Sequence, residues 1–215
     1  MTLGPAVIFD FDDTLIFSRS DRAYVLLEAL ELFGVVTNSG RIDEHWGKPF
    51  RDLVSAIAPE LSHDFDAFLH YYAKFLTSRP PTARVGVVDA LPRLAVKHHL
   101  YVHSSSHSLL VRTDLQSLGL LHFFDFICGS EWQPQPKPDP RSLSVLRDLS
   151  EGSGQGLDTA WYVGDSLTDL EITKRSDLNF IGVAFTSEAA SVFRDHGVPD
   201  NLIVSDLRAL ELIIA

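Results

Sequence analysis

Short apolar runs recur along the chain, and amphipathic stretches separate most of them. Each run has the length of a strand rather than of a helix, and a strand without polar alternation is typical of a sheet buried on both faces. Strands that alternate with helices predict an α/β fold, here a Rossmann-like, doubly wound parallel sheet covered by helices on both sides. The apolar runs span residues 6–9, 100–102, 124–128, 160–163, 180–185 and 202–204.

The segment between the first two predicted strands has a different pattern. It contains roughly ninety residues, far more than one crossover helix needs. Apolar residues recur at helical spacing over residues 23–33, behind a helix start signal at Ser20 and Asp21, and again over residues 65–75. The pattern predicts an inserted α-helical cap whose aromatic residues pack against one another.

The boundaries of this cap follow from the residues that interrupt both apolar patterns. Small polar residues at 18–20 and prolines within 78–82 predict two linkers that would form the hinge. We therefore expect the helical cap to span residues 18–82 and the Rossmann-like core to be formed by residues 1–17 and 83–215.

Composition and charge narrow the classes of function. The chain has 215 residues, of which 29 are acidic and 18 are basic, so its formal charge is −11. This charge argues against binding to nucleic acid or to an anionic membrane. Cys128 is the lone cysteine, and the N-terminus has neither the basic start nor the apolar stretch of a secretory signal. We expect a soluble cytoplasmic protein, either a monomer or a homodimer.

Acidic residues follow the first apolar run directly. Asp10 and Asp12, with Thr14 behind them, stand where the backbone would leave the sheet. Neighbouring buried carboxylates repel each other unless a metal or a proton relieves the repulsion. A helix N-cap at Asp13 or Thr14 is the plain structural alternative. That alternative does not explain why a strand runs directly into the cluster, so we favour a functional site.

A second acidic cluster follows the run at 160–163. Gly164 leads into Asp165, and Asp169 comes four residues later. If a helix begins near Ser166, Asp169 lies one turn into it and faces the same crevice as Asp165. Both carboxylates offer hard oxygen atoms for magnesium or for hydrogen bonds around it. Asp165 as a simple N-cap is the structural alternative.

Two weaker signals follow the intervening strands. Ser104 and Ser105 come after the run at 100–102, where hydroxyls and backbone N–H groups at a helix start can bind phosphate oxygens, although serines there are more often plain caps. Lys137 stands among alternating prolines, which stiffen a loop around a single cation. Rigid presentation of one lysine suits anion binding, and a solvated lysine in a turn is the structural alternative.

Taken together and in this order, the four sites resemble the haloacid dehalogenase superfamily. Its first motif, Asp-x-Asp-x-Thr, is similar to Asp10, Asp12 and Thr14. Its Ser/Thr motif, its lysine and its acidic motif are similar to Ser104, Lys137 and the pair Asp165 and Asp169. The helical insertion after the first motif resembles the small cap of the phosphoglycolate phosphatase and β-phosphoglucomutase branch. Asp13 stands where the family often has glycine.

The resemblance implies a chemical role for each matched residue. Asp10 would be the nucleophile and Asp12 the general acid and base. Mg²⁺ would be held by Asp10, Asp165 and the backbone carbonyl of Asp12, with Asp169 adding a ligand or a hydrogen bond. The implied reaction is hydrolysis of a small phosphorylated metabolite through an aspartyl phosphate.

The phosphoryl group needs partners of its own in this reading. The resemblance implies that Ser104 and Lys137 bind its oxygens, and we expect Ser105 and Thr14 to contribute to the same binding site.

Substrate choice is expected to come from the cap. The stretch from His45 to Phe50 resembles the glycine-containing cap loop that faces the catalytic site in this branch. We expect Lys48, with Arg19 or Arg22, to contact an anionic leaving group. A solvated Lys48 is the structural alternative.

Other activities remain open at this point. A phosphomutase shares the same motifs, and Lys48 leaves a Schiff-base phosphonatase formally possible. A dehalogenase has no need of an acid at the second motif position, so Asp12 disfavours it. A non-catalytic binding or regulatory protein would tolerate loss of the acids, yet all the matched positions hold competent residues.

Overall fold

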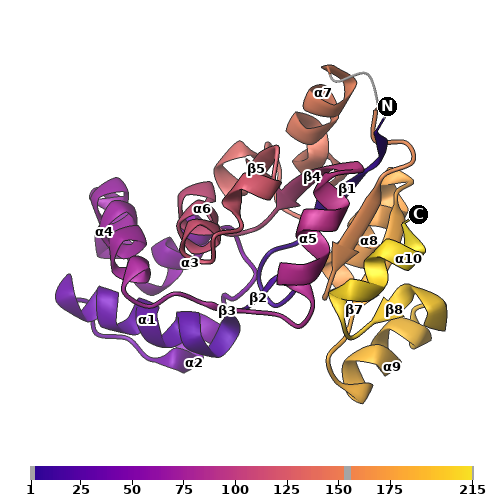
Figure 1. Cartoon of the computed structure of the whole chain (residues 1–215). Helices are drawn as coiled ribbons and strands as arrows, with labels where there is room; N and C mark the ends of the chain where they lie inside the picture. The colour runs from indigo at the N-terminus through magenta and orange to yellow at the C-terminus, as the bar shows by residue number, and fades with distance from the viewer. Residues whose placement is uncertain (1–2, 153–155, 215) are drawn as a thin grey trace.

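The computed structural model describes residues 3–152 and 156–214 (Figure 1). Its centre is a six-stranded sheet in the order β5-β4-β1-β6-β7-β8, and every neighbouring pair is parallel. This is the expected doubly wound α/β fold, and each predicted apolar run contributes one strand. The strands are β1 (Gly4–Phe9), β4 (His98–His103), β5 (Phe126–Cys128), β6 (Trp161–Gly164), β7 (Asn179–Val183) and β8 (Ile203–Val204).

Helices cover both faces of the sheet because successive side chains of a strand point to opposite sides. In β1, Val7 and Phe9 join one apolar cluster, whereas Ala6 and Ile8 join another. Residues of α5, α6 and α10 complete the first cluster, and residues of α7, α8 and α9 complete the second. The core helices are α5 (Val87–Ala95), α6 (Ser108–Ser117), α7 (Ser144–Gly152), α8 (Leu167–Ser176), α9 (Ser187–Asp195) and α10 (Leu210–Ile213).

Four helices between β1 and β4 form a separate lobe beside the sheet (Figure 1). They enclose their own apolar cluster, which core residue Leu110 of α6 also joins. A short antiparallel pair brings the two ends of the lobe together at the core. The helices are α1 (Arg19–Leu32), α2 (Ser39–Asp43), α3 (Phe50–Ile57) and α4 (Phe65–Thr77), and the paired strands are β2 (Ile16–Phe17) and β3 (Thr82–Ala83). We call residues 18–82 the cap.

The remaining regular elements are short turns of 3₁₀ helix in the connections. They are η1 (Pro59–Ser62), η2 (Leu121–Phe123), η3 (Ser130–Trp132), η4 (Pro140–Leu143), η5 (Asp200–Leu202) and η6 (Leu207–Ala209). Within the described ranges, no helix combines the length and the apolar character that crossing a membrane requires.

The first cap helix begins earlier than the expected start signal at Ser20 and Asp21. It starts at Arg19, with Ser18 in the N-cap position. The Ser18 hydroxyl does not cap the helix, because it accepts a hydrogen bond from the backbone N–H of Asp13. The expected start signal therefore lies inside the first turn of the helix, and contacts with the preceding loop are present at this end in place of side-chain capping.

The strand order places a topological switch in the middle of the sheet. The chain leaves β1 toward β4 and β5, then returns to the opposite side of β1 with β6. In such sheets a crevice opens outside the carboxyl ends of the strands at the switch. Asp10 directly follows β1 and Asp165 directly follows β6, so both predicted acidic clusters meet at this crevice.

Candidate active site

The candidate site is a cavity of about 330 Å³ that core and cap residues line together. From the core, Asp10, Asp12, Lys137 and Asp165 line it. From the cap, residues of α1, α3, α4 and the loop before α3 line it. The structure therefore brings the predicted catalytic residues into one chamber that the cap faces.

Asp10 lies at the floor of the cavity, and the sheet fixes its position. Its backbone N–H donates to the carbonyl of Val163 at 2.9 Å, which continues the ladder between β1 and β6. Its carboxylate is buried, and Oδ1 lies 2.6 Å from Nζ of Lys137. Burial raises the pKa of Asp10 well above its usual value, and Asp169 and Asp165 act in the same direction, whereas Lys137 opposes them.

Lys137 joins the buried acids together. Its Nζ donates to Asp10 and Asp169 at 2.6 and 2.9 Å, and also to the Tyr162 hydroxyl and the His103 carbonyl at 3.1 and 3.2 Å. Burial alone would lower the pKa of Lys137, but the two carboxylates outweigh it and hold that pKa well above its usual value. The lysine is thus a fixed cation beside Asp10.

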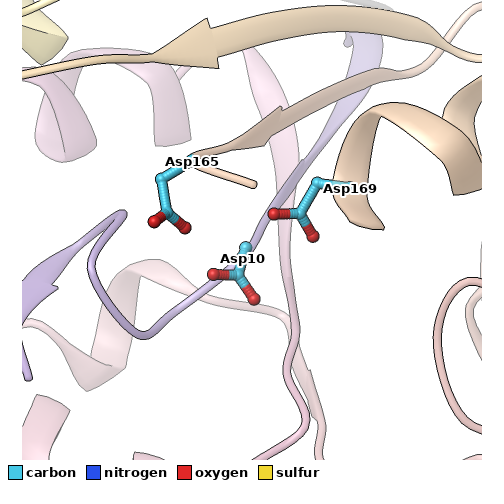
Figure 2. Close-up of side chains that lie close together, drawn as sticks. All are labelled: Asp10, Asp165 and Asp169. Carbon is cyan, nitrogen blue, oxygen red and sulfur yellow. The ribbon is translucent and has the colours of Figure 1, made fainter. Parts of the chain in front are cut away.

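Three carboxylates converge at this point (Figure 2). Figure 2 shows Asp10 at the end of β1, Asp165 after β6 and Asp169 from α8 directed toward one another. Each offers an oxygen atom, and these atoms lie within 4.8 Å of one another. Burial first, and then Asp169, raises the pKa of Asp165 to about 7. Lys137 can compensate only part of this negative charge, and hard carboxylate oxygens suit Mg²⁺, so the residues fit such an ion.

The first turn of α8 holds Asp169 in place. Ser166 caps the helix, its hydroxyl accepting from the Asp169 N–H at 3.2 Å, and Asp169 Oδ2 accepts from the Ser166 N–H at 3.2 Å. A Cβ on Gly164 would lie 2.6 Å from the Asp169 carboxylate, so glycine is required for this close approach. The helix expected near Ser166 is confirmed, and the cap residue is Ser166 and not Asp165.

Thr14 lies behind the carboxylates. It is fully buried, and its hydroxyl donates to Asp165 Oδ1 at 3.1 Å and to Asp10 Oδ2 at 3.4 Å. Thr14 is not among the residues that line the cavity. Its position suits orientation of the two carboxylates.

Asp12 is held apart from the three converging carboxylates. Its Oδ2 accepts a hydrogen bond of 2.7 Å from the Ser106 hydroxyl. Burial raises the pKa of Asp12, and Ser106 and the charge of Arg22 oppose that rise. A carboxyl group with a raised pKa that faces a cavity can hold a proton and release it to a ligand.

Asp13 occupies a backbone conformation that glycine adopts more readily. Its φ is 59°, in the left-handed region that Asp tolerates better than most residues. The side chain supports this turn, because Oδ1 accepts from the Ser18 N–H at 3.2 Å and pairs with Arg84 at 3.0 Å. No helix starts here, so neither Asp13 nor Thr14 is the N-cap that the alternative reading required.

The serines after β4 take different positions. Ser105 lines the cavity, as does Ser106. Ser104 is fully buried, and its hydroxyl accepts from the Ser106 N–H at 3.0 Å. Helix α6 starts at Ser108 with His107 as its cap residue, so the serines form the turn before the helix.

The expected cap contacts also reach the cavity. Lys48, Arg19 and Arg22 all line it. Lys48 is exposed, and its Nζ lies 2.9 Å from Nδ1 of His45. Arg19 is exposed as well and pairs with Asp43 at 3.3 Å, whereas Arg22 is buried.

Four polar residues around the cavity were not predicted from the sequence. Ser106 binds Asp12, Tyr162 and His103 surround Lys137, and Asp114 pairs with Arg22. Tyr162 and His103 lie inside apolar strands and Asp114 lies in a helix, so no local motif marks them. The turn of three serines contained the signal for Ser106, but spacing alone did not single out the third.

This geometry supports transfer of a group to Asp10. A carboxylate beside a fixed ammonium group, a second carboxyl able to hold a proton and a set of hard oxygen ligands all face one chamber. Such an arrangement positions an anionic ligand and neutralises its charge.

The chain is similar to known proteins in sequence and in fold. The family model for haloacid dehalogenase-like hydrolases matches residues 7–183. The phosphoglycolate phosphatase of Pseudomonas putida is 28% identical over an alignment of 229 positions, which covers 97% of this chain and 79% of that relative.

Solved structures share the fold. The β-phosphoglucomutase of Clostridium difficile superposes with a TM-score of 0.70 at 15% identity, covering 99% of this chain and 100% of that chain. The hydrolase YfnB of Bacillus subtilis, solved bound to magnesium, superposes with a TM-score of 0.71 at 18% identity, covering 99% of each chain. At these identities the likeness shows the arrangement of the sheet and its helices.

Proposed function

Because the chain belongs to the haloacid dehalogenase-like hydrolase family, we propose that it is a Mg²⁺-dependent phosphatase of small phosphorylated metabolites. The proposed substrate is a phosphoglycolate-like phosphomonoester, and the proposed intermediate is a phosphoryl group carried on Asp10. The observation that carries the proposal is the contact of 2.6 Å between Asp10 and Lys137, at the floor of a chamber that Asp12 also lines. The name of the Pseudomonas putida relative supports the choice of substrate.

The metal would be held by oxygens of the core. Asp10, Asp165 and the backbone carbonyl of Asp12 are the proposed ligands, and Asp169 would add a ligand or a hydrogen bond. When bound, Mg²⁺ would supply positive charge that neutralises the phosphoryl oxygens.

In the first step, the Asp10 carboxylate forms a bond to phosphorus as the ester P–O bond breaks. Asp12 enters this step protonated, which its raised pKa favours, and gives its proton to the leaving oxygen. Lys137 stabilises the negative charge that spreads over the phosphoryl oxygens. The product is an alcohol, and the phosphoryl group stays on Asp10.

In the second step, Asp12 is a carboxylate and takes a proton from water. The water oxygen bonds to phosphorus, and the bond between phosphorus and Asp10 breaks. Inorganic phosphate leaves, and both aspartates return to their starting protonation states. One residue therefore serves as acid and then as base.

The phosphoryl oxygens would be bound along the core wall. Lys137 and Ser105 line the chamber and would contact them directly. Ser104 and Thr14 lie behind this wall, so we propose that they orient the turn and the carboxylates.

Phosphate release from 2-phosphoglycolate and from p-nitrophenyl phosphate tests the proposal. With Mg²⁺ present, Asp10→Asn is expected to lower turnover by on the order of 10³-fold or more, because the nucleophile is lost. Asp195→Asn makes the same change at an exposed position at the end of α9 and is expected to keep full activity. Removal of divalent metal by EDTA is expected to abolish release, and added Mg²⁺ to restore it.

Other outcomes would point to the alternatives. Undiminished turnover in Asp10→Asn would contradict the proposed site. An isomerised sugar phosphate without phosphate release would indicate a phosphomutase. Borohydride trapping of phosphonoacetaldehyde on Lys48 would indicate a phosphonatase. Absence of Mg²⁺-dependent turnover with all phosphate esters would favour a non-catalytic binding protein.

A further inference from the structure

The turn after the nucleophile is held by residues of both linkers between core and cap. Asp13 has a φ of 59°, in the left-handed region that disfavours L residues other than glycine. Its Oδ1 accepts from the backbone N–H of Ser18 at 3.2 Å and from Nη2 of Arg84 at 3.0 Å. Its own N–H donates to the Ser18 hydroxyl at 3.1 Å. Ser18 precedes α1 and Arg84 directly follows β3, so one side chain joins the two linkers.

Arg84 also has contacts that do not involve Asp13. Its guanidinium carbon lies 3.8 Å from the ring centroid of Phe17 in β2 and 4.3 Å from that of Phe185. A cation between two aromatic faces is attracted by both. The backbone N–H of Arg84 donates to the carbonyl of Leu15 at 2.9 Å, and its side chain is only 12% exposed. The pair with Asp13 is therefore held in place, unlike a flexible ion pair at the surface.

A glycine would adopt this turn without any partner. Glycine has no Cβ and reaches positive φ at no steric cost, whereas the side chain of Asp13 makes the same conformation unfavourable by itself. The bonds from Ser18 and Arg84 oppose that cost. Loss of the Arg84 bond would therefore let the turn leave the left-handed region more often.

The conformation of this turn bears on Asp12, the proposed acid and base. Asp12 and Asp13 share a peptide plane, so a rotation about the backbone of Asp13 changes the direction of Asp12 relative to the residues that follow. The Asp12 carboxyl group has to face the chamber and accept from Ser106 at 2.7 Å. Arg84 is not among the described residues that line the chamber, so it would act through the turn and not on the substrate.

We propose that Arg84 is a positioning residue, which holds Asp13 in its left-handed conformation and thereby fixes Asp12 for proton transfer. Asp13 and Arg84 together do what a glycine at position 13 would do alone, and they also tie the turn to both cap linkers. The inference rests on the proposed function for the step that Asp12 serves.

Glycine at position 13 provides a rescue that separates this role from packing. Arg84→Met keeps a long unbranched side chain between the rings, and is expected to lower kcat roughly 3- to 10-fold through the cost of the left-handed turn. The loss should be equal for 2-phosphoglycolate and p-nitrophenyl phosphate, with KM nearly unchanged. Adding Asp13→Gly is expected to restore most of the lost kcat. Arg93→Met removes the same charge from an exposed position of α5 and is expected to change neither constant.

Urea denaturation follows the same pair without turnover. In the Arg84→Met background, Asp13→Gly is expected to raise the denaturation midpoint, because glycine relieves the turn. In the unsubstituted background, the same change is expected to lower the midpoint, because the largely buried Arg84 loses its anion. If Arg84→Met does not fold, a folded double variant shows the rescue, and an unfolded double variant overturns the inference.

A residue that only packs between the rings would gain nothing from glycine at position 13. Unchanged kcat in Arg84→Met would therefore overturn the inference, as would a loss that Asp13→Gly does not restore or an equal change of midpoint in both backgrounds. Failure of the unsubstituted protein to release phosphate from either ester would overturn the proposed function instead. The midpoints would then still decide whether Arg84 holds the turn.

Discussion

The core side and the cap side of the chamber differ in how their charges are satisfied. On the core side, Lys137 donates to Asp10, Asp169, Tyr162 and the His103 carbonyl. On the cap side, Arg22 pairs with Asp114 at 2.5 Å, and its Nε has no hydrogen-bond partner among the described residues. The contacts of Lys137 hold its Nζ in one place, whereas a donor without a partner can bind a new one. The difference suggests that the core fixes the reaction and the cap selects the substrate.

Packing explains why the two sides can differ. Asp10 and Asp165 directly follow paired strands, Lys137 lies in the loop after β5, and Asp169 lies in the first turn of α8. The sheet and the helix that follows β6 therefore determine their positions. The cap has its own apolar cluster and meets the core through the short pair β2 and β3 and through contacts with α6. Each side can therefore change without loss of the other.

With the nucleophile Asp10 kept in place, the largest expected effect comes from removing the cation at the centre of the core network. Lys137→Ala leaves Asp10 and Asp169 buried without their shared cation. We expect turnover to fall by roughly 10²- to 10³-fold through lost stabilisation of phosphoryl charge. We also expect the free energy of unfolding to fall by up to about 3–5 kcal/mol. Phosphate release and urea denaturation measure the two effects.

An exposed lysine provides the matched control for this change. Lys97→Ala removes the same side chain from the surface beyond α5 and is expected to alter neither turnover nor stability. If Lys137→Ala kept its turnover, the core network would not be the part of the molecule that fixes the reaction.

The next largest effect is expected from a change beside Asp12, and it tests the role of Asp12 as an acid. Ser106→Ala removes the hydrogen bond of 2.7 Å to Asp12 and is expected to lower kcat about tenfold, as for loss of a bond to a charged group. That bond holds the pKa of Asp12 down, so its loss raises this pKa. The high-pH limb of the kcat profile should therefore move to higher pH. A lower kcat with an unmoved limb would mean that Ser106 acts only through the fold.

Residues at strand ends were predictable because the carboxyl ends of all parallel strands lie at the same edge of the sheet. An apolar run followed by a carboxylate puts Asp10 and Asp165 at the same edge, whatever the intervening residues are. The two acids needed only the spacing and the expectation of a parallel sheet. The prolines around Lys137 gave only a weak signal, and its match to the lysine motif of the family, together with the other motifs, singled it out.

Residues that act across large separations were not predictable in this way. Ser106 and Asp12 form a hydrogen bond across 94 positions of sequence, and His103 and Tyr162 form one across 59 positions. No short sequence motif spans such separations. The pairing of Arg22 with Asp114 depends on how the cap docks on α6, which no local pattern specifies. An isolated Asp in a helix reads as a solvated residue, and only the packing shows that it is buried.

On the cap side, Lys48→Ala tests the exposed part of substrate selection. We expect KM for 2-phosphoglycolate to rise a few-fold, because an exposed charge contributes at most about 1 kcal/mol. KM for p-nitrophenyl phosphate should change much less, since its leaving group carries no carboxylate. Steady-state kinetics with both esters measures the ratio, and equal changes would remove Lys48 from the proposed contacts.

The smallest effect concerns stability on the cap side and is seen as a dependence on pH. Burial raises the pKa of Asp114 to about 7, against the opposing charge of Arg22, whereas in the unfolded chain the pKa returns to its ordinary value of 3.8. Between these two values the folded protein holds a proton that the unfolded chain has lost. The free energy of unfolding therefore falls as pH rises through this range.

Asparagine at position 114 does not titrate, so it removes this slope. The free energy of unfolding of Asp114→Asn, minus that of the unsubstituted protein, should therefore increase as pH rises from about 4 to about 7. Loss of the charge partner of Arg22 lowers the stability of the variant by an amount that does not depend on pH. This loss lowers the whole plot of the stability difference against pH and leaves its slope unchanged. Urea denaturation at a series of pH values measures the difference, and Asp195→Asn should give a nearly flat line. A flat or opposite slope for Asp114→Asn would mean that Asp114 stays ionised beside Arg22, and the cap side would then be as firmly paired as the core.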